Sequence, residues 1–350
     1  MPAPEEFDYE LPPDRIAQTP LADRDASRLM VLSRGDGAVA HQRFRDLPNH
    51  LRPGDVLVIN DTRVLPARLA LRRATGGRAE ALLLHPLPGG EGGADGGGWT
   101  ALVRPAARLR PAELLAVDGA PAEAGATVRI DRVLAGGRAE VSLLGMEAAE
   151  LLRRFGQVPL PPYIKAPLRD PERYQTVYAA REGSAAAPTA GLHFTEGTLA
   201  AAGAAGARIV RITLHVGIGT FLPARAEDLA SGRLHAEWCE VTADAAAVIN
   251  AAQRVVAVGT TAVRTLESAA LGAGGGDRVA ATAGWTDLLI APGHRFRAVD
   301  ALVTNFHLPR STLLMLVSAF AGRERILASY RQAVTEGYRF FSFGDAMLIV

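Results

Sequence analysis

The stretch RVVAVGTTAVRTLES, from Arg254 to Ser268, decides the fold of this chain. Branched apolar residues at its start are typical of a buried strand, Gly259 breaks that strand, and the rest has the spacing of a capped helix. The same alternation of strand and helix patterns continues on both sides, at 207–216, 242–253, 301–306 and 311–322. Strands that alternate with helices predict an α/β layer fold, which we expect to contain a mixed sheet.

Residues 63–150 have a different sequence pattern. Short apolar or β-branched segments, such as PARLALRR and TVRIDRVL, are separated by Gly, Pro and Asp, which is typical of a small antiparallel β-barrel. We therefore predict an α/β catalytic domain of residues 1–62 and 151–350, interrupted by an inserted β-barrel domain at 63–150. The end of the chain, 324–350, is predicted to form a helix that stops near Gly337 and then a pair of strands.

Composition excludes several classes of protein. The longest apolar run, LLMLVSAFAG, is too short to span a bilayer. The N-terminus carries acidic residues and prolines where a signal peptide needs a positive start, so we expect a cytoplasmic protein. The single cysteine, Cys239, excludes an internal disulfide and a zinc site with several thiolates. The net charge of +1 does not by itself indicate a nucleic-acid surface.

The junction after Gly259 is the first candidate site. In open α/β sheets, ligands bind at the carboxyl ends of strands, where a helix N-terminus offers free amide donors to an anion. Thr260 and Thr261 could cap the helix and contact a ligand, and Arg264 is placed for a carboxylate or phosphate. A plain helix cap with a surface arginine explains the same residues equally well.

A second junction, ALVTNFHLPRSTLLML, ends its predicted strand with Asn305, Phe306 and His307. Asparagine can bind the edge of a purine, and histidine can move protons near neutral pH. The alternative is an ordinary turn with a half-buried histidine. Taken alone, the junction favours the ordinary turn.

Histidines stand near two further predicted element ends. His215 ends the strand ITLHV and is followed by Gly217 and Gly219, which allow a ligand close to the backbone. His193 lies in PTAGLHFT, and Glu237 lies in HAEWCEV. Zinc is the rival ligand, but these residues lack the paired spacing of a helical or ribbon metal site, so we predict no metal.

Eight segments, in order along nearly the whole chain, carry a family resemblance. They are GDVLVINDTRVLPARL, VPLPPYI, PTAGLHFT, LHVGIGTF, HAEWCEV, VGTTAVRTLES, TNFHLPRSTLLMLVSAFAG and YRFFSFGDAML. Together they resemble the S-adenosylmethionine:tRNA ribosyltransferase-isomerase family of queuosine biosynthesis. A methyltransferase is the rival enzyme, but its glycine-rich loop must follow a strand, whereas the run LGAGGGD follows a predicted helix. A non-catalytic RNA-binding module is the rival from another class.

The resemblance implies that S-adenosylmethionine, as co-substrate, donates its ribosyl carbons to an aminomethyl-deazaguanine at the wobble position of tRNA. A proton leaves the sugar carbon beside the sulfonium, and adenine departs. The primary amine of the base then joins the ring-opened sugar, and closure of an epoxide expels methionine. The products are epoxyqueuosine-tRNA, adenine and methionine. We expect the enzyme to act as a monomer and to need no metal.

The resemblance also gives the candidate residues their roles. Proton transfer is assigned to His193, His215 and His307, with His215 ranked first because its glycine-flanked strand end allows a ligand the closest approach. The methionyl carboxylate is assigned to Thr260, Thr261 and Arg264, the ribose hydroxyls or support of a histidine to Glu237, and adenine to Asn305. Cation–π attraction of the sulfonium is assigned to Phe194, Phe221 and Phe306, although core packing is the favoured role of any single one of them. The other substrate-binding candidates are Thr189, Gly191, Gly217, Gly219 and Thr220.

For tRNA, the predicted barrel carries two groups of arginines. They are Arg63, Arg68, Arg72 and Arg73 near one strand, and Arg104, Arg108 and Arg110 near another. Arginine binds phosphates and stacks on the exposed bases of RNA loops, which suits an anticodon arm. Arginines that are simply solvated on a strand surface are the alternative.

Overall fold

The structure is a computed structural model that describes residues 3–87, 97–217, 231–274, 276 and 278–350. The chain divides into two compact units. The first unit comprises Met1–Arg63 and Pro161–Val350, and the second comprises Val64–Leu160. Among the described residues, no helix is long and apolar enough to span a membrane.

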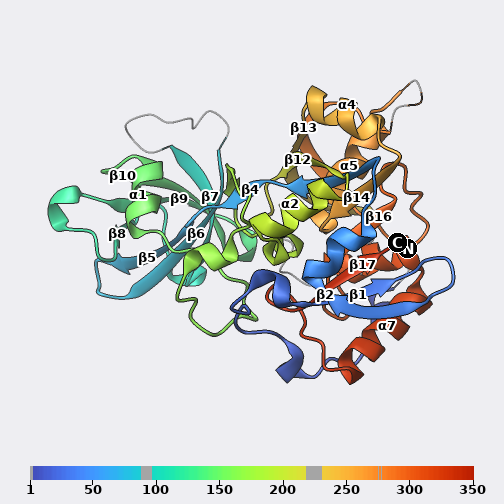
Figure 1. The fold of residues 1–350 in the computed structure, drawn as a ribbon. Coiled ribbons are helices and arrows are strands. Elements are labelled where there is room, and N and C mark those ends of the chain that lie inside the picture. The colour runs from blue at the N-terminus through green and yellow to red at the C-terminus, as the bar shows by residue number, and fades with distance from the viewer. Residues whose placement is uncertain (1–2, 88–96, 218–230, 275, 277) are drawn as a thin grey trace. The chain divides into compact units, whose positions relative to one another are not determined.

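The first unit is an α/β layer fold around a nine-stranded mixed sheet (Figure 1). The strands are, in spatial order, β15 (Thr282–Leu288), β13 (Arg233–Val241), β12 (Arg208–Leu214), β3 (Asp55–Asn60), β14 (Arg254–Val258), β16 (Ala301–Asn305), β17 (Ala346–Ile349), β1 (Arg28–Leu32) and β2 (Val39–Arg43). The central strands β12, β3, β14 and β16 run parallel, and β17 and β1 run antiparallel to them. The predicted mixed-sheet α/β fold is confirmed.

Helical segments cover both faces of this sheet. They are α2 (Glu196–Ala204), α4 (Ala243–Asn250), α5 (Thr260–Leu271), α6 (Thr312–Ala321), α7 (Arg323–Thr335) and the 3-10 turns η4 (Phe44–His50) and η9 (Thr189–His193). Side chains of β3 alternate between the faces: Val56 and Val58 join the core with α4 to α7, whereas Leu57 and Ile59 join the core with α2, η4 and η9. Burial on both faces explains the unbroken apolar runs 56–59 of β3 and 255–258 of β14.

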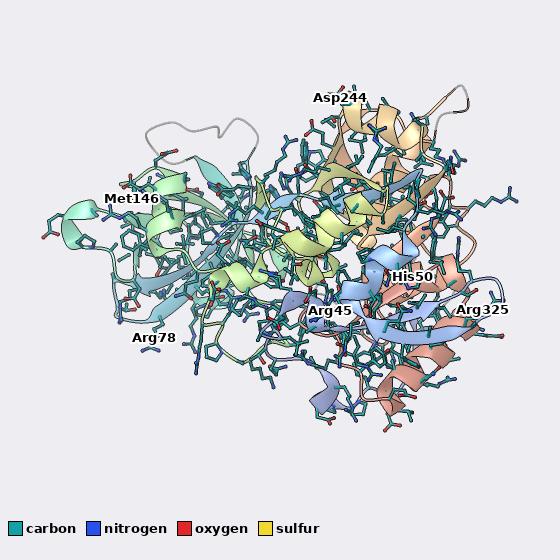
Figure 2. The ribbon with its side chains drawn as sticks, viewed as in Figure 1. Arg45, His50, Arg78, Met146, Asp244 and Arg325 are labelled. Atoms are coloured by element: carbon teal, nitrogen blue, oxygen red, sulfur yellow. The ribbon has the colours of Figure 1, made fainter. Side chains whose placement is uncertain are left out.

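Short polar residues start these helices where the chain leaves the sheet. The side chain of Thr242 caps α4, and the side chain of Ser311 caps α6. Asp244, labelled in Figure 2, lies in the first turn of α4, where a carboxylate suits the helix dipole.

The carboxyl ends of the parallel strands meet at one edge of the sheet. β3 ends there at Asn60, β14 at Val258 and β16 at Asn305. The antiparallel strand β17 begins at the same edge, because Asn305 pairs with Ala346. Polar residues that follow β14 and β16 and those that precede β17 are therefore brought together.

The second unit is a closed barrel of six antiparallel strands (Figure 1). They are, in spatial order, β10 (Arg138–Leu144), β7 (Gly98–Arg104), β6 (Arg78–Pro86), β5 (Arg68–Arg73), β8 (Leu114–Val117) and β9 (Thr127–Val133), and β9 pairs with β10 to close the barrel. Leu69 and Leu71 of β5 point into the barrel and alternate with more exposed neighbours. Helix α1 (Ala148–Phe155) belongs to this unit. The predicted β-barrel is confirmed.

Two short strands lie outside both sheets, and one predicted element is wrong. β4 (Thr62–Val64) pairs with β11 (Arg181–Ser184). After α7, the predicted pair of strands is a single strand, β17, because the segment before it forms a tight turn with one isolated bridge, from Phe340 to Ile16.

Candidate functional site

A cavity of about 280 Å³ opens at the carboxyl edge of the sheet in the first unit. Its mostly apolar wall comes from the loops after β14 and β16, from η9, and from the turn before β17. Six of the lining residues are site candidates that the sequence predicted: Thr189, Thr260, Thr261, Asn305, Phe306 and His307. Residues far apart in the sequence are thus gathered by the topology of one sheet edge.

Two helices begin at this cavity. Gly259, Thr260 and Thr261 start α5, and Ser311 caps α6 through its hydrogen bond from the Leu314 N–H (3.2 Å). The free amide donors of two helix N-termini make this part of the wall favourable for an anionic group.

A hydrogen-bonded chain runs behind the cavity through His193. Thr189 donates to Asn305 Oδ1 (2.9 Å), Asn305 Nδ2 donates to His193 Nε2 (3.1 Å), and His193 Nδ1 lies 2.8 Å from Ser27 Oγ. Because Nε2 accepts, the neutral ring carries its proton on Nδ1 and donates to Ser27. Burial, with the charges of Arg339 and Arg24 nearby, lowers the pKa of His193 to about 3. Both ring nitrogens are engaged within the protein, and so is the Asn305 amide.

His307 is a buried histidine in the cavity wall. Its ring Nε2 lies 2.9 Å from Thr304 Oγ1. Its backbone N–H donates to the Tyr330 hydroxyl (3.1 Å), and its backbone carbonyl accepts from the Tyr9 hydroxyl (2.5 Å). Burial lowers its pKa to about 3. The ring is therefore neutral at physiological pH; Thr304 contacts its Nε2, and the two tyrosines hold the backbone of the residue.

His215 lies apart from the described cavity wall. Its Nδ1 is 2.8 Å from Thr62 Oγ1, and its ring stacks on Trp238 at 5.2 Å. Burial and the charge of Arg181 lower its pKa to about 4. A Cβ at position 183 would lie 2.7 Å from the ring, so Gly183 allows this close packing.

Glu237 and Arg264 form an ion pair in the interior. Their side chains are 5% and 7% exposed, and Glu237 also accepts from the Gly217 N–H (2.7 Å). Arg264 Nε donates to the Leu288 carbonyl (3.1 Å). Arg264 was expected at the methionyl carboxylate, but within the described residues its partners are these internal groups and it does not line the cavity.

Two more candidates from the sequence, Phe194 and Gly191, are packed tightly in the interior. Phe194 is fully buried and its ring contacts Phe44 at a centroid distance of 4.8 Å. Gly191 packs so closely that a Cβ would lie 2.1 Å from the Tyr178 hydroxyl. The candidates Gly219, Thr220 and Phe221 lie outside the described residues.

Sequence reasoning missed Ser27, Tyr163, Phe341 and Ser342. Ser27 holds His193, and the other three line the cavity. Tyr163, Phe341 and Ser342 lie in VPLPPYI and YRFFSFGDAML, two of the segments that carry the family resemblance, but none of the four residues stands at the end of a predicted strand or in a histidine motif. Within the described residues, no group of three or more His, Cys, Asp or Glu side chains is placed to hold a metal ion.

The arginines assigned to tRNA fall into two kinds. Arg63 of the first unit pairs with Glu172 (2.5 Å), and in the barrel Arg68 pairs with Glu80, Arg72 with Asp118 and Arg73 with Glu113. Arg104, Arg108 and Arg110 are exposed, and no ion pair joins them to a carboxylate in the described part of the chain.

An apolar cavity at the carboxyl edge of an α/β sheet, with helix N-termini and neutral histidines in and behind its wall, is the arrangement of an enzyme that takes a small-molecule substrate. A family described as "Queuosine biosynthesis protein" matches residues 4–349. Two relatives named S-adenosylmethionine:tRNA ribosyltransferase-isomerase are similar over 99% of both chains: one from Moorella thermoacetica at 56% identity and one from Symbiobacterium thermophilum at 54%.

A solved structure is similar as well. The crystal structure of S-adenosylmethionine tRNA ribosyltransferase from Thermotoga maritima is 36% identical, with 99% of this chain and 100% of that chain covered and a TM-score of 0.55. The chain therefore belongs to the queuosine biosynthesis protein family. The resemblance carried by the eight segments is confirmed, and so is the prediction that the chain is an enzyme of this class.

Proposed function

We propose that this chain transfers and isomerises the ribosyl part of S-adenosylmethionine onto the aminomethyl-deazaguanine wobble base of tRNA, which yields epoxyqueuosine-tRNA, adenine and methionine. The full-length relationship to enzymes that carry this activity in their name is the observation on which the proposal rests. The cavity supports it with a site for a small co-substrate. The cytoplasmic location and the monomeric state stay predictions.

S-adenosylmethionine is placed with its carboxylate at the starts of α5 and α6. Thr260 and Thr261 offer hydroxyl and amide donors to the carboxylate there. Phe306 is fully buried and its ring packs against Tyr330, Tyr338 and Phe340, so we assign it to support of the wall and not to the sulfonium. Arg264 is reassigned: paired with Glu237, it supports the strand and helix beside the cavity instead of binding the carboxylate.

His307 is the histidine that we assign to proton transfer, because it lines the cavity and its ring is neutral. A base whose conjugate acid has a pKa of about 3 is weak, so its contribution lies at the low end for general bases. His193 is a positioning residue: it orients Asn305, which with Thr189 forms a polar part of the wall. His215, which the sequence ranked first for proton transfer, is the alternative to His307.

The proposed reaction requires a bound S-adenosylmethionine, a group that accepts a proton and an apolar wall. A proton moves from the sugar carbon beside the sulfonium to the general base, and the electron pair left on that carbon breaks the bond between the neighbouring carbon and the ring oxygen. The freed oxygen then forms a carbonyl at the carbon that carries adenine, the carbon–nitrogen bond breaks, and adenine leaves with that electron pair. The amine of the tRNA base bonds to the opened sugar, and the sulfur leaves as methionine when an oxygen of the sugar closes the epoxide. The apolar wall keeps water from the carbanion.

Incubation of the enzyme with S-adenosylmethionine and tRNA that carries the aminomethyl-deazaguanine tests the proposal. Chromatography is expected to show adenine and methionine in equal amounts, in step with epoxyqueuosine in the tRNA. In the same assay, His307→Asn is expected to turn over at least tenfold more slowly, while the exposed His85→Asn is unchanged.

Other products would refute this function. Adenosylhomocysteine in place of adenine identifies a methyltransferase, and tRNA binding without turnover identifies a binding module. Normal turnover of His307→Asn with a tenfold loss in His215→Asn returns the proton-transfer role to His215.

The exposed arginines of the barrel are expected to carry tRNA binding. In Arg104→Gln/Arg108→Gln, the affinity for tRNA should fall, and the slope of log K against log salt should shrink by roughly one to two, because each phosphate contact contributes about 0.7 to 0.9. Arg72→Gln is the matched control, since Asp118 already pairs with Arg72. Filter binding at several salt concentrations measures both quantities. Equal slopes in wild type and the double variant would place the RNA elsewhere.

A further inference from the structure

Phe341 has a backbone conformation that residues with a side chain rarely adopt. Its φ is 72°, in the left-handed region where glycine is the usual residue. Among the described non-glycine residues, Arg310 (φ 58°) and Ala112 (φ 63°) share this property. Phe341 and Arg310 both line the cavity. Strain that is kept at a cavity wall points to a function that needs the side chain.

The surrounding loop fixes this conformation at both peptide groups of Phe341. Its N–H donates to the Phe306 carbonyl (3.2 Å), and its own carbonyl accepts from the Gly344 N–H (2.9 Å). A Cβ at position 344 would lie 2.5 Å from the Arg339 carbonyl oxygen, which explains the glycine there. Glycine would also relieve position 341, yet the chain has phenylalanine at that point.

Tyr163 holds the Phe341 ring in the wall. The two ring centroids are 4.5 Å apart with their planes tilted by 57°, and the Tyr163 hydroxyl forms a hydrogen bond with Ser342 Oγ (2.6 Å). All three residues line the cavity, and Phe341 is half-buried. A tilted neighbour fixes a ring from one side and leaves a face for an offset-stacked partner.

We propose that Phe341 is the stacking face for the adenine ring of S-adenosylmethionine, and that Tyr163 positions Phe341. This inference rests on the proposed function, in which adenine must first be held and then released. An aromatic face holds a purine by stacking, with no hydrogen bond that must break before the free base leaves.

The surroundings favour the adenine of a small co-substrate over a base of the tRNA. A nucleotide in an RNA chain brings phosphates, which need an unpaired cation. Among the described lining residues, Arg310 is the one with a permanent charge, and it already pairs with Asp8 (Nε to Oδ2, 2.8 Å). The volume of about 280 Å³ is close to the lower end of the range for small-molecule sites.

Calorimetric titration of the full-length protein with adenine and with S-adenosylmethionine tests the proposal. Phe341→Ala is expected to weaken both ligands about tenfold or more. Phe341→Tyr, which keeps a flat ring, should bind within about threefold of wild type, and Phe341→Leu, apolar but not flat, should be as weak as alanine. Wild-type affinity for adenine in Phe341→Ala would overturn the proposal, and so would equal binding by the leucine and tyrosine variants.

Two further outcomes separate this proposal from its neighbours. A defect confined to the KM for tRNA, with adenine and S-adenosylmethionine bound as in wild type, overturns it and places the wobble base on Phe341. A wild-type protein that binds adenine but releases none from S-adenosylmethionine refutes the proposed function, while the stacking measurement still decides the role of Phe341.

The backbone strain is tested separately from the ring. Phe341→Gly and Phe341→Ala both lack the ring, so a difference between their melting temperatures reports the backbone. The Phe341→Gly variant is expected to melt at a higher temperature than Phe341→Ala, whereas at most positions the alanine variant is the more stable. Ala247→Gly, at an exposed position of α4, is the control and should melt lower than wild type. A less stable glycine variant at 341 would remove the strain on which the proposal is built.

Discussion

Replacement of Glu237 by alanine is expected to lower the free energy of unfolding by about 3–5 kcal/mol. Arg264 would keep its charge in the interior, where its side chain is 7% exposed. Its Nη2 already lacks a hydrogen-bond partner, and after the substitution only the Leu288 carbonyl would remain of the contacts described above. An unpaired buried charge is far more costly than the loss of a surface pair.

Urea denaturation followed by circular dichroism measures this effect against two controls. Asp287→Ala breaks the exposed pair with Arg233 on the neighbouring strand and should lower stability by less than about 1 kcal/mol. Glu237→Leu combined with Arg264→Met removes both charges and should recover most of the loss. If Glu237→Ala unfolds as Asp287→Ala does, Arg264 is hydrated in solution and the pair is not a buried one.

Mild acid is expected to destabilise the protein well above the range in which most carboxylates titrate. His193 and His307 have their pKa values lowered to about 3 by burial, against 6.5 in the unfolded chain. Below pH 6.5 the unfolded chain binds more protons than the folded one, so the stabilisation present at higher pH is lost as the pH falls from 6.5 toward 3. Between pH 8 and pH 5 the two histidines together account for a loss of roughly 4 kcal/mol.

The slope of unfolding free energy against pH measures this difference in bound protons. His307→Asn should reduce the slope by about a third in the window from pH 6 to pH 5, because His193 and His215 keep their lowered pKa values, whereas His85→Asn, on the exposed surface of the barrel, should leave it unchanged. A stability that stays constant from pH 8 to pH 5 would mean that the folded protein also protonates these rings.

The central layer of the fold could be predicted because its physical signals are local. β14 and β16 are each an apolar run followed by a break and a helix pattern, and that order implies parallel strands whose carboxyl ends share an edge. Thr260, Asn305 and His307 were found for this reason. The barrel was found because its strands are short and separated by turn residues.

Partnerships between distant residues could not be predicted. Arg264 follows the pattern of a ligand-binding arginine. Nothing near it in the sequence shows that its guanidinium forms an ion pair with Glu237 of β13. Ser27 and Tyr163 precede no helix and end no strand, so they reach the site only through the tertiary fold. The second strand expected before β17 failed because tight turn geometry around Phe341 overrides the strand propensity of its aromatic residues.

The place of β17 between β16 and β1 has a consequence for synthesis on the ribosome. β1, near the start of the chain, joins the rest of the sheet through β17, and the contact from the Arg28 N–H to Asp345 spans 317 residues. At about 5–20 residues per second, β1 and β2 wait roughly 15–60 s for the strand that connects them to the sheet. The hydrogen-bonded chain from Ser27 to Asn305 is assembled late for the same reason. The nascent enzyme thus stays inactive, with an open strand edge beside β16, until its final segment has emerged.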